Sequence, residues 1–263
     1  MFLEEVLERA RARVREARLL RPESSFSISL PEKPFRFRES LRRAEGQGIR
    51  LVAEVKRRSP SRGSIHEGAK VSHLARAYER GGAHAISVLT EPHFFGGSLE
   101  DLEEAGKASS LPLLRKDFVV DEYQVLEARK AGADAVLLIA TALGTNALAK
   151  LIGLCQELGM DSLVEVHDRK DLEKALEAGA EMVGINNRDL RTLRVDMSTT
   201  EELFPLVPRD RVVVSESGFR GPEDVRRVEE LGVDAVLVGE YLMRADDPAR
   251  AAALLLGGRK DVR

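Results

Sequence analysis

The sequence predicts an α/β protein, a closed (β/α)8 barrel of parallel strands with an N-terminal helical extension. Eight short apolar runs alternate with helical patterns from residue 49 onwards, which fits a barrel better than an open sheet. Four helix ends repeat one phrase, in which a glycine precedes the next apolar run. No Gly-x-Gly-x-x-Gly motif follows the first run, which counts against a dinucleotide-binding fold.

The N-terminal segment, residues 1–48, is expected to pack on the barrel as an extension rather than to form a separate domain. It begins with an amphipathic helical pattern, MFLEEVLERARARVREARLL, and continues into a proline-containing linker, RPESSFSISLPEKP. We place the catalytic barrel itself in residues 49–263.

The strands follow one another along the rest of the chain. Each apolar run is too short for a helix and lacks the alternation of a half-buried strand, which is typical of a parallel strand buried on both faces. The expected strands are 49–55, 83–89, 112–115, 134–139, 162–166, 182–186, 211–215 and 234–238.

A repeated phrase marks the helices that end before the second, fourth, sixth and eighth strands. It reads AYERGGAHAISVL, ARKAGADAVLL, ALEAGAEMVGI and VEELGVDAVLVG. Glycine adopts the left-handed conformation that terminates a helix without steric cost. We therefore expect these helices to end at Gly82, Gly132, Gly179 and Gly232.

Composition limits which partners the protein can bind and indicates its cellular compartment. The net charge is −3 and no basic block stands out, so we expect no nucleic-acid partner. No apolar run is long enough to cross a membrane, and the single cysteine, Cys155, lies in an apolar helical stretch as a core residue. We expect a cytoplasmic protein. The few thermolabile amides, three Asn and three Gln, fit a thermophile.

Polar residues gather at the expected carboxyl ends of five strands, where active sites of such barrels form. A single charge there is usually a solvated rim residue, but burying several is costly unless they pair or meet a charged ligand. We therefore predict a functional cluster. It consists of two lysines, three glutamates and an asparagine from five strands. The polar residues at these strand ends are Glu54, Lys56, Lys116, Asp117, Glu165, Asn186, Asn187, Arg188, Glu216 and Ser217.

Two glycines, Gly218 and Gly239, come just after the last two strands. Barrel enzymes often hold a phosphate at this place on backbone N–H groups, which glycine leaves open to close approach. Tight-turn geometry is the alternative explanation for these glycines.

The chain as a whole resembles the indole-3-glycerol phosphate synthase family of tryptophan biosynthesis. The matching phrases are AEVKRRSPSRG, SVLTEPHFFGGS, LLRKDFVVDEYQV, LVEVHD, GINNRDL, VVSESG and VGEYLM, in the family's order. The resemblance implies a TIM barrel lyase that closes a ring, decarboxylates and dehydrates. Its substrate would be 1-(2-carboxyphenylamino)-1-deoxyribulose 5-phosphate, and its products indole-3-glycerol phosphate, CO2 and water.

The resemblance also implies roles for individual residues. Lys116 matches the family's general acid for the condensation. Glu165 matches a residue to which the family assigns acid–base catalysis in the later steps. Lys56 matches a residue that contacts the phosphate or donates a proton in dehydration, and these alternatives stay open. Glu54 would hold Lys56 in place. The remaining implied contacts are Asn186 and Glu216 to the intermediate, Ser59, Arg188, Ser217, Gly218, Gly239 and Glu240 to the substrate or its phosphate, and Phe95 or Phe94 to the anthranilate ring.

One position departs from the family's pattern. Glu240 stands where a small hydroxyl residue often follows the phosphate glycine, so its acidic side chain must turn away from the phosphate. The resemblance implies no metal and no organic cofactor. We expect a monomer, with a weak homo-oligomer as the alternative.

Two rival functions remain open at this point. A phosphoribosylanthranilate isomerase would carry a cysteine at the end of its first strand, where this chain has Glu-Val-Lys. A non-catalytic phosphate-binding barrel would keep Gly218 and Gly239 but would not need Lys116 and Glu165 together.

The segment RRSPSRG, residues 57–63, follows the first strand and carries three arginines without an apolar anchor. We expect it to make few buried contacts and to close over an anionic ligand as a mobile cover.

Overall fold

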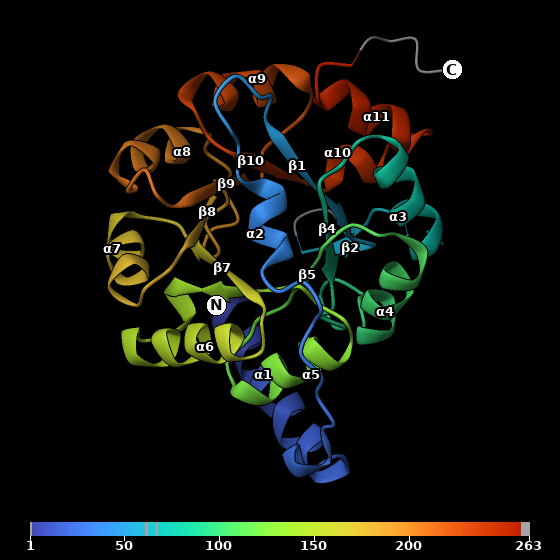
Figure 1. Ribbon diagram of the computed structural model, residues 1–263, viewed down its shortest axis with the longest axis vertical. Helices are drawn as coiled ribbons and strands as arrows, with labels where there is room; N and C mark the ends of the chain where they lie inside the picture. Colours follow the sequence, from blue (N-terminus) through green and yellow to red (C-terminus); the bar gives the residue numbers. More distant parts are fainter. Residues whose placement is uncertain (1, 61–62, 67, 259–263) are drawn as a thin grey trace.

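The computed structural model describes residues 2–60, 63–66 and 68–258, and eight parallel strands close into a barrel at its centre (Figure 1). The predicted fold class is confirmed, and each strand lies within two residues of its expected range. The strands are β1 (Arg50–Val55), β4 (Ala85–Leu89), β5 (Leu113–Lys116), β6 (Ala135–Ile139), β7 (Asp161–Val166), β8 (Met182–Asn186), β9 (Val212–Glu216) and β10 (Ala235–Val238).

Helices surround the barrel and connect its strands (Figure 1). The connecting helices are α3 (Val71–Arg80), α4 (Leu99–Ala108), α5 (Glu122–Lys130), α6 (Thr145–Glu157), α7 (Arg169–Glu177), α8 (Ser198–Leu203) and α9 (Pro222–Leu231), with the short 3-10 turns η2 (Ala140–Ala142) and η3 (Phe204–Leu206). Helices α10 (Glu240–Met243) and α11 (Pro248–Leu255) follow the last strand. The four predicted helix-ending glycines all have positive φ angles, between +85° and +101°. Their conformation confirms the expected helix ends.

The alternation of side chains along each strand determines which of them point into the barrel. Apolar residues at Val52, Leu114, Leu163 and Val214 pack inside it, while their neighbours along each strand pack outward against the helices. Because side chains alternate between the two faces of a strand, the residue two positions later also points inward. In each of these four strands that residue is charged, which places Glu54, Lys116, Glu165 and Glu216 in the barrel mouth.

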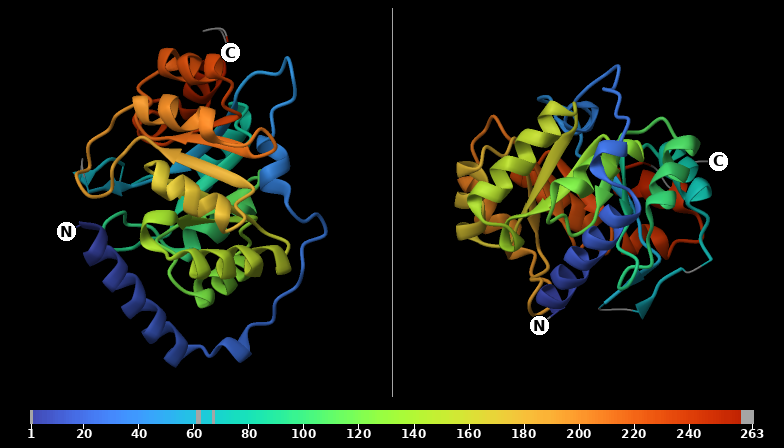
Figure 2. Two further views of the ribbon diagram at one scale, coloured as in Figure 1. Left: turned by 90° about the vertical axis from the view of Figure 1, so that its left-hand side faces the viewer. Right: turned by 90° about the horizontal axis from the view of Figure 1, so that it is seen from below.

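The helical extension runs from one end of the barrel to the other. Helix α1 (Phe2–Leu20) begins beside the mouth, and its linker, which contains the turn η1 (Glu23–Ser25), returns along the barrel to α2 (Arg36–Leu41), as Figure 2 shows. Helix α2 buries Phe37 and Leu41 in the inner apolar cluster. Its Arg38 N–H donates to Asp161 at the start of β7 (2.8 Å), so α2 closes the amino-terminal end of the barrel.

Helix α1 is fixed to the barrel by a buried charge pair. Arg13 binds Asp117 through both guanidinium nitrogens, at 2.8 and 3.3 Å. Asp117 directly follows Lys116 and is fully buried. The extension is thus tied to the strand end that carries the expected acid.

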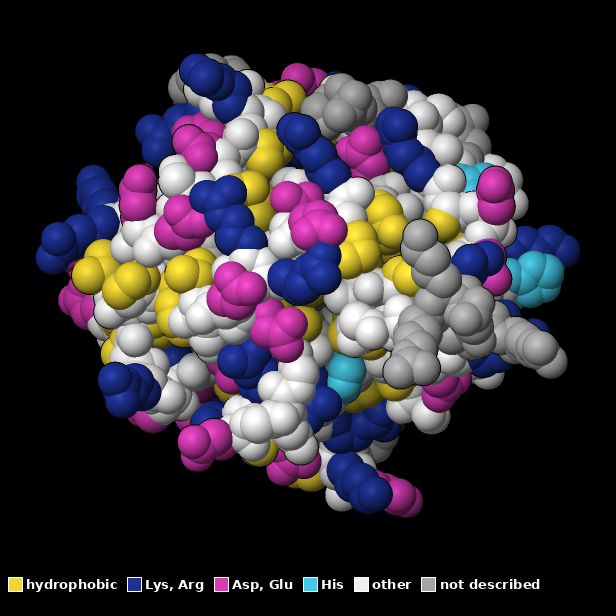
Figure 3. All heavy atoms as spheres, turned by 90° about the horizontal axis from the view of Figure 1, so that it is seen from above, with side chains coloured by type: hydrophobic (Ala, Val, Ile, Leu, Met, Phe, Trp, Pro, Cys, Tyr) yellow, Lys and Arg dark blue, Asp and Glu magenta, His cyan; other side chains and the backbone are white. Residues whose placement is uncertain are grey.

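The surface matches the modest net charge. Figure 3 shows basic and acidic side chains interspersed over one face of the molecule. Within the described part of the chain, no helix combines the length and the apolar character needed to cross a membrane. Cys155 is buried on α6, as predicted, and burial raises the pKa of its thiol to about 12.

Candidate active site

A cavity of about 550 Å³ opens at the carboxyl ends of the barrel strands. This volume is within the range of small-molecule sites. Every site residue that the resemblance implied, apart from Phe94, lines the cavity. These residues are Glu54, Lys56, Ser59, Phe95, Lys116, Glu165, Asn186, Arg188, Glu216, Ser217, Gly218, Gly239 and Glu240.

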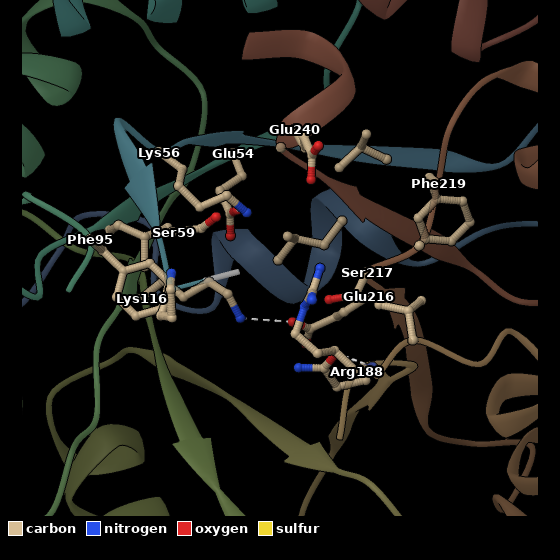
Figure 4. Close-up of a pocket in the computed structure, with 18 of the residues that line it drawn as sticks. Glu54, Lys56, Ser59, Phe95, Lys116, Arg188, Glu216, Ser217, Phe219 and Glu240 are labelled. Carbon is tan, nitrogen blue, oxygen red and sulfur yellow. Dashed lines mark hydrogen bonds and ion pairs between the residues drawn. The ribbon is translucent and has the colours of Figure 1, made fainter. Parts of the chain in front are cut away.

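The Lys116 side chain points into the cavity toward Glu216 (Figure 4), and it also contacts Glu165. Its Nζ is 2.8 Å from Glu216 Oε2 and 3.2 Å from Glu165 Oε2. Burial opposes the charged ammonium, but the charges of Glu216, Glu165 and Glu54 outweigh it and raise the pKa of Lys116 above its ordinary value. These neighbours therefore hold Lys116 protonated, as a proton donor must be.

The two glutamates that contact Lys116 differ in their proton affinity. Burial raises the pKa of Glu216 to about 7; the charges of Glu165 and Glu54 add to this, although Lys116 opposes it. Burial also opposes ionisation of Glu165, but Lys116 and His167 outweigh it and lower the pKa of Glu165. One carboxyl group of the cluster can thus carry a proton near neutral pH while the other is a carboxylate.

We expect Glu216→Gln to stabilise the protein at pH 8 and to change little at pH 5. The folded-state pKa of about 7 lies above the ordinary value of 4.5, so folding favours the protonated form of Glu216. The stability linked to this group is present below pH 4.5 and is lost as the pH rises through 7, and a neutral amide escapes that loss. Thermal unfolding of both proteins at the two pH values measures the effect. An equal change in Tm at both would contradict the raised pKa.

Glu54 and Lys56 form the second charge pair of the cavity. Lys56 Nζ donates to Glu54 Oε1 at 2.5 Å, and the Glu54 side chain is almost fully buried. A Cβ atom at Gly239 would overlap Glu54 Oε1, so this glycine leaves room for the carboxylate. The space that Glu54 needs therefore explains why residue 239 is a glycine, in addition to the phosphate contact expected from its position.

Gly184 is a site residue that the sequence reasoning missed. It lies inside β8, where a Cβ atom would overlap Glu216 Oε1. A glycine in the middle of a strand is a signal of close approach by another group. That signal was present in EMVGIN, but the strand alone does not show which group approaches.

Two further polar residues at the strand ends, Asp117 and Asn187, bind neighbouring parts of the fold through their side chains. The Asp117 carboxylate contacts Arg115 (3.1 Å) and accepts from the Thr90 hydroxyl (2.9 Å), besides binding helix α1. The Asn187 amide donates to Ser215 Oγ at 3.2 Å and joins the ends of β8 and β9. Each stands one position out of phase with the inward residue before it. Asp117 nevertheless belongs to the lining of the cavity, whereas Asn187 does not.

The end of the cavity where a phosphate is expected is built by the turn after β9 and by α10. Ser217 and Gly218 have φ angles of +67° and +93°, which orient this turn toward the cavity wall. Arg188, Arg220 and Arg244 line the same region. Glu240 also lies here, and its carboxylate is 3.3 Å from the guanidinium of Arg244. The expected turn of the Glu240 side chain away from an anion stays a prediction.

The opposite side of the cavity is aromatic. Phe2, Phe95 and Phe118 line it, and Phe95 lies 6.3 Å from Phe118 between ring centroids. Phe94 packs edge-on against Phe2 at 5.2 Å and does not belong to the lining. Of the two aromatic candidates, the structure places Phe95 at the cavity and Phe94 behind it.

The segment after β1 forms a two-stranded hairpin, β2 (Arg58–Ser59) with β3 (Gly63–Ser64). The expectation of few buried contacts is wrong at its base, because Arg57 binds Asp101 through two nitrogens, at 2.5 and 2.7 Å. Ser59 is buried at the cavity, and its hydroxyl has no hydrogen-bond partner among the described residues. The expected cover also includes Ser61 and Arg62, which lie outside the described residues.

Comparisons with known proteins point to one family. The sequence model of the indole-3-glycerol phosphate synthase family matches residues 3–255. The indole-3-glycerol phosphate synthase of Campylobacter jejuni subsp. jejuni serotype O:23/36 (strain 81-176) is 44% identical, over 97% of this chain and 100% of the relative. That of Dehalococcoides mccartyi (strain CBDB1) is 48% identical, over 95% of each. A solved 3-hexulose-6-phosphate synthase from Salmonella typhimurium, at 16% identity, has a TM-score of 0.62 over 80% of this chain and 97% of that chain, which shows the fold alone.

Proposed function

The chain belongs to the indole-3-glycerol phosphate synthase family of tryptophan biosynthesis, and from this premise we propose the reaction of its cavity. The protein acts as a carboxy-lyase that converts 1-(2-carboxyphenylamino)-1-deoxyribulose 5-phosphate to indole-3-glycerol phosphate, CO2 and water. The observation that carries the proposal is the ammonium of Lys116, held between Glu165 and Glu216 in the cavity. A barrel that only binds phosphate has no need for this arrangement.

The two sides of the cavity suit the two ends of this substrate. The phosphate would lie against the turn at Ser217 and Gly218, where backbone N–H groups and the nearby arginines favour an anion. The anthranilate ring would lie on the aromatic side, next to Phe95. Figure 4 shows Phe95 and Ser217 on opposite sides of the Lys116 ammonium. The ribulose carbonyl of a substrate in this orientation would lie near Lys116.

The chemistry assigns a task to each charged group. In ring closure, the aromatic carbon attacks the ribulose carbonyl, and Lys116 gives a proton to the oxygen as it becomes an alkoxide. Loss of CO2 then leaves a cyclic alcohol. Its hydroxyl group departs as water once it is protonated, and a base removes a proton from the neighbouring carbon, so that the double bond of the indole forms. Glu165, an ionised carboxylate in contact with Lys116, is the base we propose for this later step. Lys56 either donates the proton to the departing hydroxyl or contacts the phosphate.

Indole fluorescence tests the proposed function. The chain contains no tryptophan, so a product signal has almost no protein background. We expect fluorescence to rise when the purified protein receives the carboxyphenylamino substrate and to stay flat with phosphoribosylanthranilate. A product from the second compound alone would favour the isomerase, and binding of the first without turnover would favour a phosphate-binding barrel.

Gly218→Val is expected to weaken competitive inhibition by inorganic phosphate. A Cβ atom at Gly218 would lie 2.9 Å from Val195 Cγ1 and would stand in a backbone with φ of +93°. A branched side chain at this turn blocks approach of an anion to the backbone. Gly132→Val is the matched control, because Gly132 has a similar φ of +89° and open space around it, far from the cavity. Equal phosphate inhibition of both variants and the parent would place the phosphate elsewhere.

A further inference from the structure

His167 lies directly behind the proposed base. It follows β7 two residues after Glu165, and its side chain is 7% exposed. His167 is not among the described residues that line the cavity. His167 can therefore act on the reaction only through a residue that does face the substrate.

Glu165 is held from both sides by cationic groups. Lys116 Nζ lies 3.2 Å from its Oε2, and His167 Nε2 lies 3.2 Å from its Oε1. The histidine contact is an ion pair rather than an aligned hydrogen bond, because Nε2 has no partner that meets hydrogen-bond geometry. Since each oxygen faces a different cation, the carboxylate has one favourable orientation.

The other side of the imidazole is also surrounded by polar groups. His167 Nδ1 is 3.1 Å from the hydroxyl of Thr141 on η2 and 3.6 Å from Asp171 Oδ2 on α7. The Thr141 hydroxyl donates to the same carboxylate. Lys174, one turn further along α7, lies 3.6 Å from Asp171 Oδ1 and donates to two backbone carbonyls.

These neighbours favour the charged form of the ring. Two carboxylates, Glu165 and Asp171, contact His167 itself, whereas Lys174 reaches only the far oxygen of Asp171. Burial would lower the pKa of His167, but the contacts with Asp171 and Glu165 outweigh it and raise the pKa to about 9. The ring is thus an imidazolium at neutral pH.

We propose that His167 is a positioning residue, whose imidazolium keeps Glu165 ionised and holds its carboxylate toward the substrate. Asp171 and Thr141 fix the ring in turn. The inference rests on the proposed function, because it gives Glu165 the part of a base. No proton needs to leave His167 during turnover, so the residue acts by charge and orientation alone.

The pH profile of kcat tests this role with the variant His167→Gln. Loss of an opposite charge within a few ångström typically raises a carboxyl pKa by about 1–3 units. We expect the acid limb of the profile, which reports Glu165 ionisation, to move toward neutral pH by about one unit or more. KM should change little, because the side chain does not face the substrate. An acid limb equal to that of the parent would overturn the proposal.

His84→Gln is the matched control. His84 is a part-buried histidine at the start of β4, where its Nδ1 accepts from the Leu51 N–H at 3.2 Å. This is the end of the barrel opposite the cavity, so the same substitution there should leave the pH profile unchanged. A shift of equal size in both variants would mean that loss of any buried histidine moves the profile, and would overturn the specific role of His167.

An NMR titration of the parent protein is a second test of the proposal. It measures the protonation state of His167 directly and needs no folded variant at position 167. The imidazole signal of His167, assigned by single replacement of the other four histidines, should remain that of an imidazolium at pH 7.5. A neutral ring at that pH would overturn the proposal. The titration needs no substrate, so absence of turnover in the parent would reject the proposed function while this measurement still decides the state of His167.

Discussion

Lys116→Ala is expected to lower kcat by about 10²–10⁴-fold, the typical loss when a positioned acid is removed. The reason is geometric, because Lys116 Nζ, the proton donor that we propose, is held between Glu165 and Glu216 in the cavity. The variant leaves two buried carboxylates without their cation. They are expected to take up protons rather than unfold the barrel, so a folded, inactive protein should result.

Steady-state kinetics and a thermal unfolding curve measure both parts of this result. Lys107→Ala is the control, since Lys107 lies on α4 with 79% of its side chain exposed and pairs with Glu103 across one helical turn. The control should keep the kcat of the parent. A Lys116→Ala protein that also kept it would show that the acid is a different group.

Glu165→Gln is expected to lower kcat by about 10²-fold or more, with the loss in the steps after ring closure. The amide keeps the size of the side chain and its hydrogen bond with Lys116 but cannot accept a proton. In a single-turnover experiment, substrate should therefore disappear faster than indole fluorescence appears. The rate of each process is measured on the same quenched samples.

The control for this variant is Glu173→Gln. Glu173 lies on α7 with 65% of its side chain exposed, and it pairs with Arg169 on the same helix. The control should show equal rates of substrate loss and indole formation, as in the parent. An effect of Glu165→Gln on KM alone, with kcat intact, would recast Glu165 as a binding residue.

Strand period explains why much of the site was predictable. In β1, β5, β7 and β9 an inward apolar residue is followed two positions later by a charge, so the direction of Glu54, Lys116, Glu165 and Glu216 follows from the sequence once the strands are placed. The helix-ending glycines likewise depend only on local backbone geometry. Both kinds of inference need no knowledge of distant parts of the chain.

Other features depend on contacts between segments that are distant in the chain. Helix α2 has only six residues, too few for a helical period to be read, and its role at the closed end of the barrel depends on Asp161 far along the chain. Phe2 reaches the cavity because α1 folds back across the mouth. His167 lies beyond the end of β7, where strand alternation no longer fixes the direction of a side chain.

The most direct test of the account is the ratio of CO2 to indole-3-glycerol phosphate formed by the parent protein. Ring closure with loss of the anthranilate carboxylate predicts one CO2 for each indole, released at the same rate in one sample of carboxyphenylamino substrate. Lys116→Ala should depress both signals together, because both follow the ring closure in which we propose that Lys116 is the acid. Consumption of the substrate without CO2, or CO2 release without an indole signal, would contradict the proposed reaction.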